Sequence, residues 1–85
     1  MTSSMRLSPN PAQGQCRLEL NGVGPEGMEI RLLNTLGQSV RSLQATPAAN
    51  RLDLSLDLQG LASGHYVVEC RQEGRSWWGK IIISQ

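Results

Sequence analysis

The heptapeptide RLDLSLD, residues 51–57, alternates apolar and polar side chains without a break. Three leucines occupy every second position and polar residues fill the gaps: Leu52, Leu54 and Leu56 against Asp53, Ser55 and Asp57. A period of two is typical of a β-strand, because successive side chains of a strand point to opposite sides. This stretch therefore predicts a strand with one buried face and one solvated face.

The same alternation recurs on both sides of this heptapeptide. It is found in QCRLEL (15–20), GMEIRLLN (27–34), GHYVVECRQ (64–72) and SWWGKIIIS (76–84). Segments rich in glycine, proline and asparagine separate these runs, and helical spacing is limited to one short turn around residues 58–62. About seven short strands separated by turns predict an all-β fold, namely a small immunoglobulin-like antiparallel β-sandwich.

The length and the net charge of the chain exclude several classes of function. The 85 residues suffice for one domain, which we place at residues 6–85, with residues 1–5 interpreted as an artificial start or the remnant of a linker. The formal net charge is only +1, and the basic residues form no stripe with interleaved aromatics, so we expect no nucleic-acid partner. We expect that residues 1–5 are not part of a signal peptide, because no apolar run follows them, and no run reaches the roughly 18 apolar residues that span a membrane.

The sequence contains no recognisable catalytic or metal-binding constellation. Its one histidine, His65, falls on the polar side of its run and has no ligand spacing with the two cysteines. The stretch GVGPEG, residues 22–27, matches G-x-G-x-x-G, but a strand and not a helix follows it, so a hairpin loop is favoured. We therefore expect no enzyme activity, no metal, no cofactor and no small-molecule substrate.

The two cysteines fall on the apolar sides of their runs. Cys16 belongs to the second expected strand and Cys70 to about the sixth, and in an immunoglobulin-type sandwich these strands lie in opposite sheets. A disulfide between them and a pair of buried free thiols are equally compatible with the pattern, because a sequence supplies no distance.

Four short motifs follow one another along the chain. They are PNPAQG (9–14), NTLGQ (34–38), GHY (64–66) and KIII (80–83). Together they closely resemble the C-terminal sorting domain of proteins exported by the type IX secretion system of Bacteroidota, in its type A form. The resemblance covers the chain from Leu7 onward.

That resemblance implies a function. Such a domain is a secretion and sorting signal that directs an attached cargo across the outer membrane, and a sortase-like cysteine peptidase usually removes it afterwards. The implied partners are the outer-membrane translocon, its shuttle proteins, the peptidase and a cargo domain on the amino-terminal side. The implied location is the periplasm in transit and then the cell surface or the extracellular space.

The resemblance also implies which residues carry the signal: Pro9, Asn10, Pro11, Gly14, Gly37, Gly64, Tyr66, Lys80, Ile81, Ile82 and Ile83. We expect the prolines to hold residues 9–14 extended, crossing a sheet edge or bridging the sheets, because proline offers no amide to a ladder. The glycines are expected in turn conformations closed to other residues, and the tyrosine in the core with its hydroxyl near the surface. The last strand is expected to offer an exposed edge for docking.

A second interpretation is a stand-alone immunoglobulin-like module for surface adhesion or glycan binding. It rests on Trp78, which the alternation places on the outer face of the last strand, where a polar residue is the ordinary choice.

Overall fold

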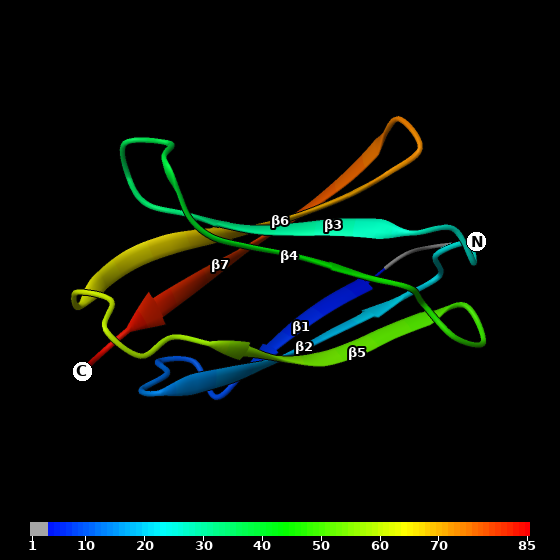
Figure 1. Ribbon diagram of the computed structural model, residues 1–85. Helices are drawn as coiled ribbons and strands as arrows, with labels where there is room; N and C mark the ends of the chain where they lie inside the picture. The colour runs from blue at the N-terminus through cyan, green and yellow to red at the C-terminus, as the bar shows by residue number, and fades with distance from the viewer. Residues whose placement is uncertain (1–3) are drawn as a thin grey trace.

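Seven β-strands make up the fold in a computed structural model that describes residues 4–85 (Figure 1). The strands are β1 (Ser4–Ser8), β2 (Gln15–Asn21), β3 (Met28–Leu33), β4 (Ser39–Ala45), β5 (Arg51–Asp57), β6 (Gly64–Gln72) and β7 (Arg75–Ile83). No helix occurs between residues 4 and 85. Strand β1 begins two residues before the predicted domain boundary, and residues 1–3 of the expected leader lie outside the described residues.

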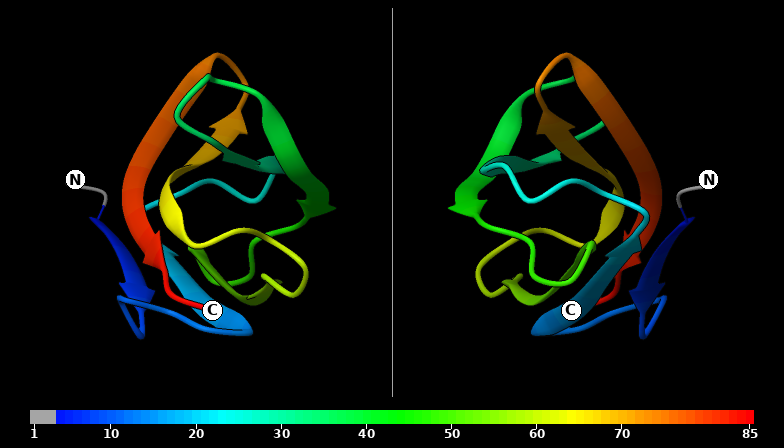
Figure 2. Two further views of the ribbon diagram at one scale, coloured as in Figure 1. Left: turned by 90° about the vertical axis from the view of Figure 1, so that its left-hand side faces the viewer. Right: turned by 90° about the vertical axis from the view of Figure 1, so that its right-hand side faces the viewer.

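The strands form two antiparallel sheets packed face to face (Figure 2). One sheet has the order β1-β2-β5 and the other the order β4-β3-β6-β7. The heptapeptide at residues 51–57 is β5, and it pairs in register with β2, so that Leu52 lies opposite Leu20 and Leu56 opposite Cys16. This arrangement confirms the predicted all-β sandwich of seven strands.

The inward positions of both sheets supply one aliphatic core. Its buried members are Ala12, Cys16, Leu18, Leu20, Val23, Met28, Ile30, Leu32, Leu52, Leu56, Leu58, Tyr66, Val68, Cys70, Ile81 and Ile83. Burying one leucine or isoleucine side chain contributes about 1.5–3 kcal/mol, which is the main term opposing chain entropy in a domain this small. The alternation that predicted the strands thus also identified their inward sides.

Residues with positive φ angles form the tight turns. The β6–β7 hairpin turns through Glu73 and Gly74, whose φ angles of 45° and 79° correspond to the I′ turn that matches strand twist. A short turn closes between Leu58 and Leu61, with Gly60 at φ 83°. The expected helical turn around residues 58–62 is therefore wrong, because the positive φ of Gly60 makes this a β-turn.

The GVGPEG stretch does not form the expected hairpin loop, because β2 and β3 lie in different sheets. It crosses from one sheet to the other and is held by the buried side chain of Gln72. The Gln72 amide donates to the carbonyl oxygens of Gly24 (2.9 Å) and Glu26 (2.8 Å), and its oxygen accepts from the Gly24 amide at 3.2 Å. This loop has a structural role.

Cys16 and Cys70 are both buried free thiols in opposite sheets, and burial raises the pKa of Cys70 to about 12. Strands β2 and β6 run in the same direction across the core (Figure 1), and their far ends meet where Gly24 bonds Gln72. Cys16 is the second residue of β2, whereas Cys70 lies near the end of β6. Of the two alternatives that the sequence left open, the structure has the pair of buried free thiols.

Candidate recognition surface

The proline segment (residues 9–14) lies against the outer edge of β7. The side chain of Asn10 makes the hydrogen bonds that the backbone of a neighbouring strand would make. Its amide donates to the Lys80 carbonyl at 3.1 Å, and its oxygen accepts from the Ile82 amide at 3.0 Å. Ala12 continues this pairing, because its amide donates to the Ile82 carbonyl and its carbonyl accepts from the Ser84 amide, both at 2.8 Å. Residues 80–84 of the last strand therefore have their edge groups satisfied.

This contact corrects two expectations about the ends of the chain. The edge of β7 beside residues 80–84 is covered by the chain itself, so it is not the exposed docking edge that was expected. The proline segment also bends repeatedly and is not extended, and both peptide bonds that precede its prolines are cis. It does bridge the sheets as expected, since it leaves β1, touches β7 in the other sheet and returns to β2.

The NTLGQ motif forms the loop between β3 and β4. The side-chain oxygen of Asn34 accepts from the amides of Leu36 (2.9 Å) and Gln38 (3.0 Å), and its amide group donates to the Gln38 side chain. Gly37 has a φ of 80°, as expected for a glycine chosen for its turn conformation. The loop presents Leu36 at its tip, with 80% of that residue exposed.

The GHY motif fixes the start of β6. Tyr66 is buried, and its hydroxyl donates to the Ala62 carbonyl at 2.6 Å, the tyrosine corner seen in immunoglobulin-like sandwiches. Gly64 has the expected positive φ. Gly14 does not, and an added Cβ there would make only ordinary contact with Gln59, so the turn role expected for Gly14 is wrong.

Strand β7 divides the KIII motif into two pairs. Ile81 and Ile83 point into the core and are each 1% exposed. Lys80 and Ile82 point outward, and Ile82 keeps 40% of its surface exposed. Trp78 lies on the same outward side two residues earlier and is 56% exposed. The motif therefore combines a structural half with a half that faces solvent.

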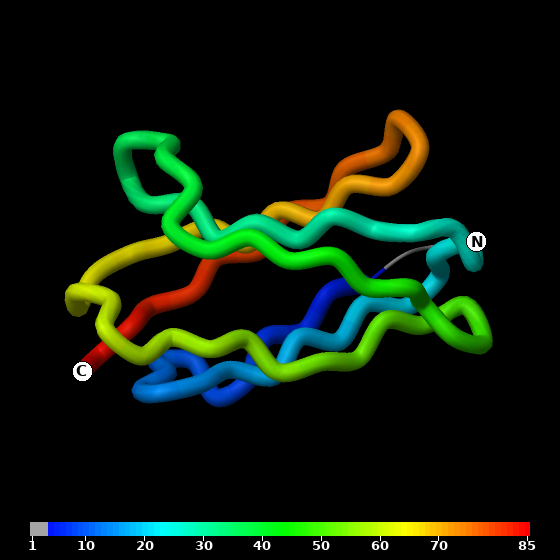
Figure 3. The backbone as a smooth tube through the Cα atoms, in the orientation of Figure 1, coloured from blue at the N-terminus to red at the C-terminus, as the bar shows by residue number. Residues whose placement is uncertain are grey.

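Three of the four motifs line one hollow on the outer face of the four-stranded sheet. The hollow measures about 220 Å³ and is lined by Asn34, Thr35, His65, Tyr66, Val67 and Lys80. The fourth motif, the proline segment, bonds the backbone of β7 beside it. All four lie at the end of the sandwich drawn at the left of Figure 3. We call the hollow together with Trp78 and Ile82 the β7 face.

A partly buried ion pair borders the β7 face. Glu69 lies opposite Trp78 on one side and opposite Arg31 on the other, and it is only 5% exposed although it points away from the core. Both Nε and Nη2 of Arg31 donate to its Oε1, at 2.9 Å and 2.6 Å. Alternation in GHYVVECRQ puts Glu69 on the outward side of its strand, and its long neighbours Arg31 and Trp78 bury it there.

Sequence reasoning missed the roles of Asn34, Ala12 and the Arg31–Glu69 pair. For Asn34 a signal existed, because asparagine three residues before glycine is a common turn arrangement. The other two depend on which strands are neighbours, which the sequence does not state. His65 lies at the rim of the hollow, and no group of three or more His, Cys, Asp or Glu residues gathers anywhere in residues 4–85.

Between residues 4 and 85 the structure contains no helix that could span a lipid bilayer.

Comparison with known proteins identifies the family. A family model described as the secretion system C-terminal sorting domain matches residues 6–84, nearly the whole chain. A search of curated proteins gives no significant match. The matched region contains the whole of the β7 face and the four motifs around it. The chain belongs to the family of type IX secretion C-terminal sorting domains.

Proposed function

We propose that this sorting domain is recognised in its folded state, through the β7 face. The domain is a type IX secretion sorting signal, whose task is to send an attached cargo across the outer membrane. The observation that supports the proposal is the convergence of the four motifs around β7, three on the hollow beside Lys80 and the fourth on the edge of the strand.

Folding is required because the contributing segments are far apart in sequence. Asn10 and Ile82 are separated by 72 positions, yet a hydrogen bond joins them. A linear peptide that contains only KIII would lack the hollow, the covered edge and the fixed direction of the Lys80 side chain. The signal is therefore a surface and not a string of residues.

In this proposal the translocon and its shuttle proteins bind the β7 face as the protein leaves the periplasm. A sortase-like cysteine peptidase then separates the domain from its amino-terminal cargo, which reaches the cell surface or the medium. Trp78 and Ile82 support a protein contact, because exposed apolar side chains that gather on one side of a strand, unlike ones scattered singly, mark interaction sites.

The test is a cargo fusion that carries Lys80→Ala together with Ile82→Ser. Neither side chain contributes to the core, so thermal unfolding should stay close to that of the parent, within about 1 kcal/mol. Export of the cargo should fall strongly, with the precursor retained in the periplasm. The control is Arg17→Ala on the outer face of the other sheet, which should export normally. Normal export of a stably folded double variant would contradict the proposal.

A second candidate, an adhesion or glycan-binding module, is supported only by Trp78. An exposed indole can stack on a sugar ring, and Trp78 is the one tryptophan of the described residues with more than half its surface exposed. Saccharides that quench the fluorescence of the chain but not of a Trp78→Ala variant would favour this function. Absence of quenching together with failed export of the double variant above would exclude it as the main function.

A further inference from the structure

The hollow in the β7 face carries a positive charge that nothing in the described chain balances. Lys80 takes part in none of the four ion contacts found between residues 4 and 85. No Asp or Glu is among the six residues that line the hollow. Glu69, the carboxylate of β6, is already engaged by Nε and Nη2 of Arg31. An acidic group from outside would therefore meet an uncompensated cation.

The other groups in the hollow suit the same kind of ligand. The Thr35 hydroxyl and the His65 ring can each donate a hydrogen bond, whereas the Asn34 side chain is occupied by its own loop. A single lysine with two neutral donors matches one carboxylate. A phosphate carries more charge and is usually held by clustered arginines and lysines, which this hollow lacks.

The neighbours of Lys80 along β7 define what flanks that carboxylate. Trp78 and Ile82 project from the same side of the strand, two residues before and two residues after Lys80. Two residues of extended chain span about 7 Å, and the spacing is the same in any extended partner segment. A partner strand laid along β7 would thus meet apolar, cationic and apolar positions in turn.

We propose that the β7 face binds an extended segment of a partner protein in which an Asp or Glu lies between two apolar residues, each two positions away. The carboxylate enters the hollow beside Lys80, and the apolar side chains cover Trp78 and Ile82. This inference rests on the proposed function, because it names the chemistry of the partner that reads the same face.

A direct test titrates the isotope-labelled 85-residue chain with acetyl-Leu-Ser-Glu-Ser-Leu-amide and its Gln counterpart, following amide resonances by NMR. We expect shifts centred on Thr35, His65 and Lys80, and about threefold or greater preference for the Glu peptide at low salt, in the range of an exposed ion pair. The preference should disappear in Lys80→Met, persist in Lys80→Arg and weaken in about 1 M salt. Equal binding of the two peptides, absence of binding, or shifts confined to the other sheet would each overturn the inference.

Two further arms identify the source of the effect. Inorganic phosphate that shifts the same resonances more strongly than the Glu peptide would show a general anion site and overturn the inference. In a secreting host, normal export of Lys80→Met alongside failed export of Ile82→Ser would sink the carboxylate inference and leave the proposed function standing. Normal export of both variants would contradict the proposed function itself.

Discussion

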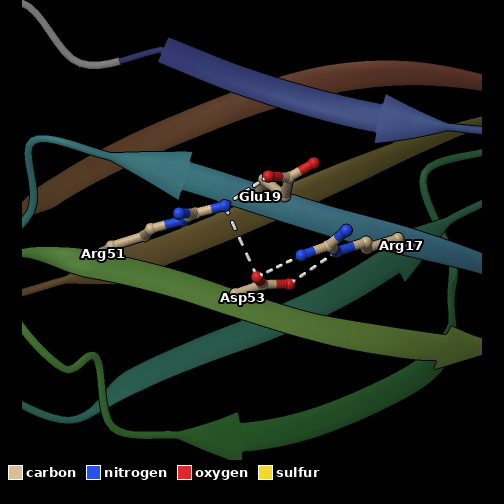
Figure 4. A network of polar contacts seen from close by, with 4 residues as sticks. All are labelled: Arg17, Glu19, Arg51 and Asp53. Carbon is tan, nitrogen blue, oxygen red and sulfur yellow. Dashed lines mark hydrogen bonds and ion pairs between the residues drawn. The ribbon is translucent and has the colours of Figure 1, made fainter.

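The outer face of the three-stranded sheet and the outer face of the four-stranded sheet differ in what their exposed side chains do. On the first, Arg17 pairs with Asp53 at 2.6 Å, and Arg51 reaches both Glu19 (2.5 Å) and Asp53 (3.5 Å) (Figure 4). All four side chains stand on neighbouring strands β2 and β5 and remain partly exposed. Such a ladder is satisfied within the sheet and in water, so it needs no partner.

The face of the four-stranded sheet combines a partly buried ion pair with exposed apolar groups. The Arg31–Glu69 pair is as short as its counterpart on the other sheet, but only 6% of the Glu69 side chain is exposed, against 35% for Asp53. Beside it lie Trp78 and Ile82, which gain nothing from water. The same alternation of side chains therefore forms the outer faces of both sheets. The kind of outward residue decides which face is satisfied in water and which face favours a protein partner.

The largest effect should come from the two sides of one strand. Ile81→Ala should cost about 3 kcal/mol of unfolding free energy, because it leaves a cavity in the core, and export should fail as the domain unfolds. Ile82→Ala, one position later, should cost less than about 1 kcal/mol. Chemical denaturation of the two variants measures this difference. Equal losses of stability would mean that β7 is not oriented as described.

A smaller effect is expected from the partly buried ion pair. Glu69→Ala leaves the Arg31 guanidinium without its acceptor in a partly buried site, and we expect a loss of about 2 kcal/mol. The matched variant Asp53→Ala, on the solvated face, should leave the melting temperature unchanged. A larger loss for Asp53→Ala than for Glu69→Ala would reverse the comparison of the two faces.

Trp78→Ser tests the difference between the two outer faces with a smaller loss of stability. More than half of the residue is exposed, so the loss in stability should be about 1 kcal/mol or less, while export of a fused cargo should drop clearly. Arg51→Ser on the other sheet serves as the control and should export like the parent. Immunoblots of periplasmic and extracellular cargo give the readout. Equal export by both variants would show that the Trp78 side chain takes no part in recognition.

The smallest effect should be the acid response of the ion-pair ladder. The hydrogen bond from Arg17 holds the pKa of Asp53 below its ordinary value. A lowered pKa means that the pair stabilises the fold above the ordinary carboxylate pKa and loses this contribution as the pH falls through the lower value. Because both groups are exposed, the parent should be only slightly more stable than Asp53→Asn at neutral pH and low salt. This small difference should disappear as the pH falls through the lowered pKa of Asp53. A marked destabilisation at pH 7 would show a coupled network.

Much of the strand layout could be predicted from local pattern alone. The alternation in RLDLSLD and in the last strand separated inward from outward residues correctly, because neighbouring side chains of a strand must point to opposite sides. The resemblance to sorting domains correctly led to the expectation of Tyr66 in the core and Gly37 in a turn conformation. These features depend on a few consecutive residues.

The sequence by itself therefore determined five of the seven strands, their inward sides and, through its four motifs, the family of the protein. Only the tertiary structure decided that Asn10 covers the edge of β7, that Glu69 is buried, and that Cys16 and Cys70 are buried free thiols. The physical reason is the separation along the sequence between the residues that interact. Side-chain direction is fixed by the pleat of each strand, whereas strand order and the offset between sheets follow from packing segments as many as 72 positions apart.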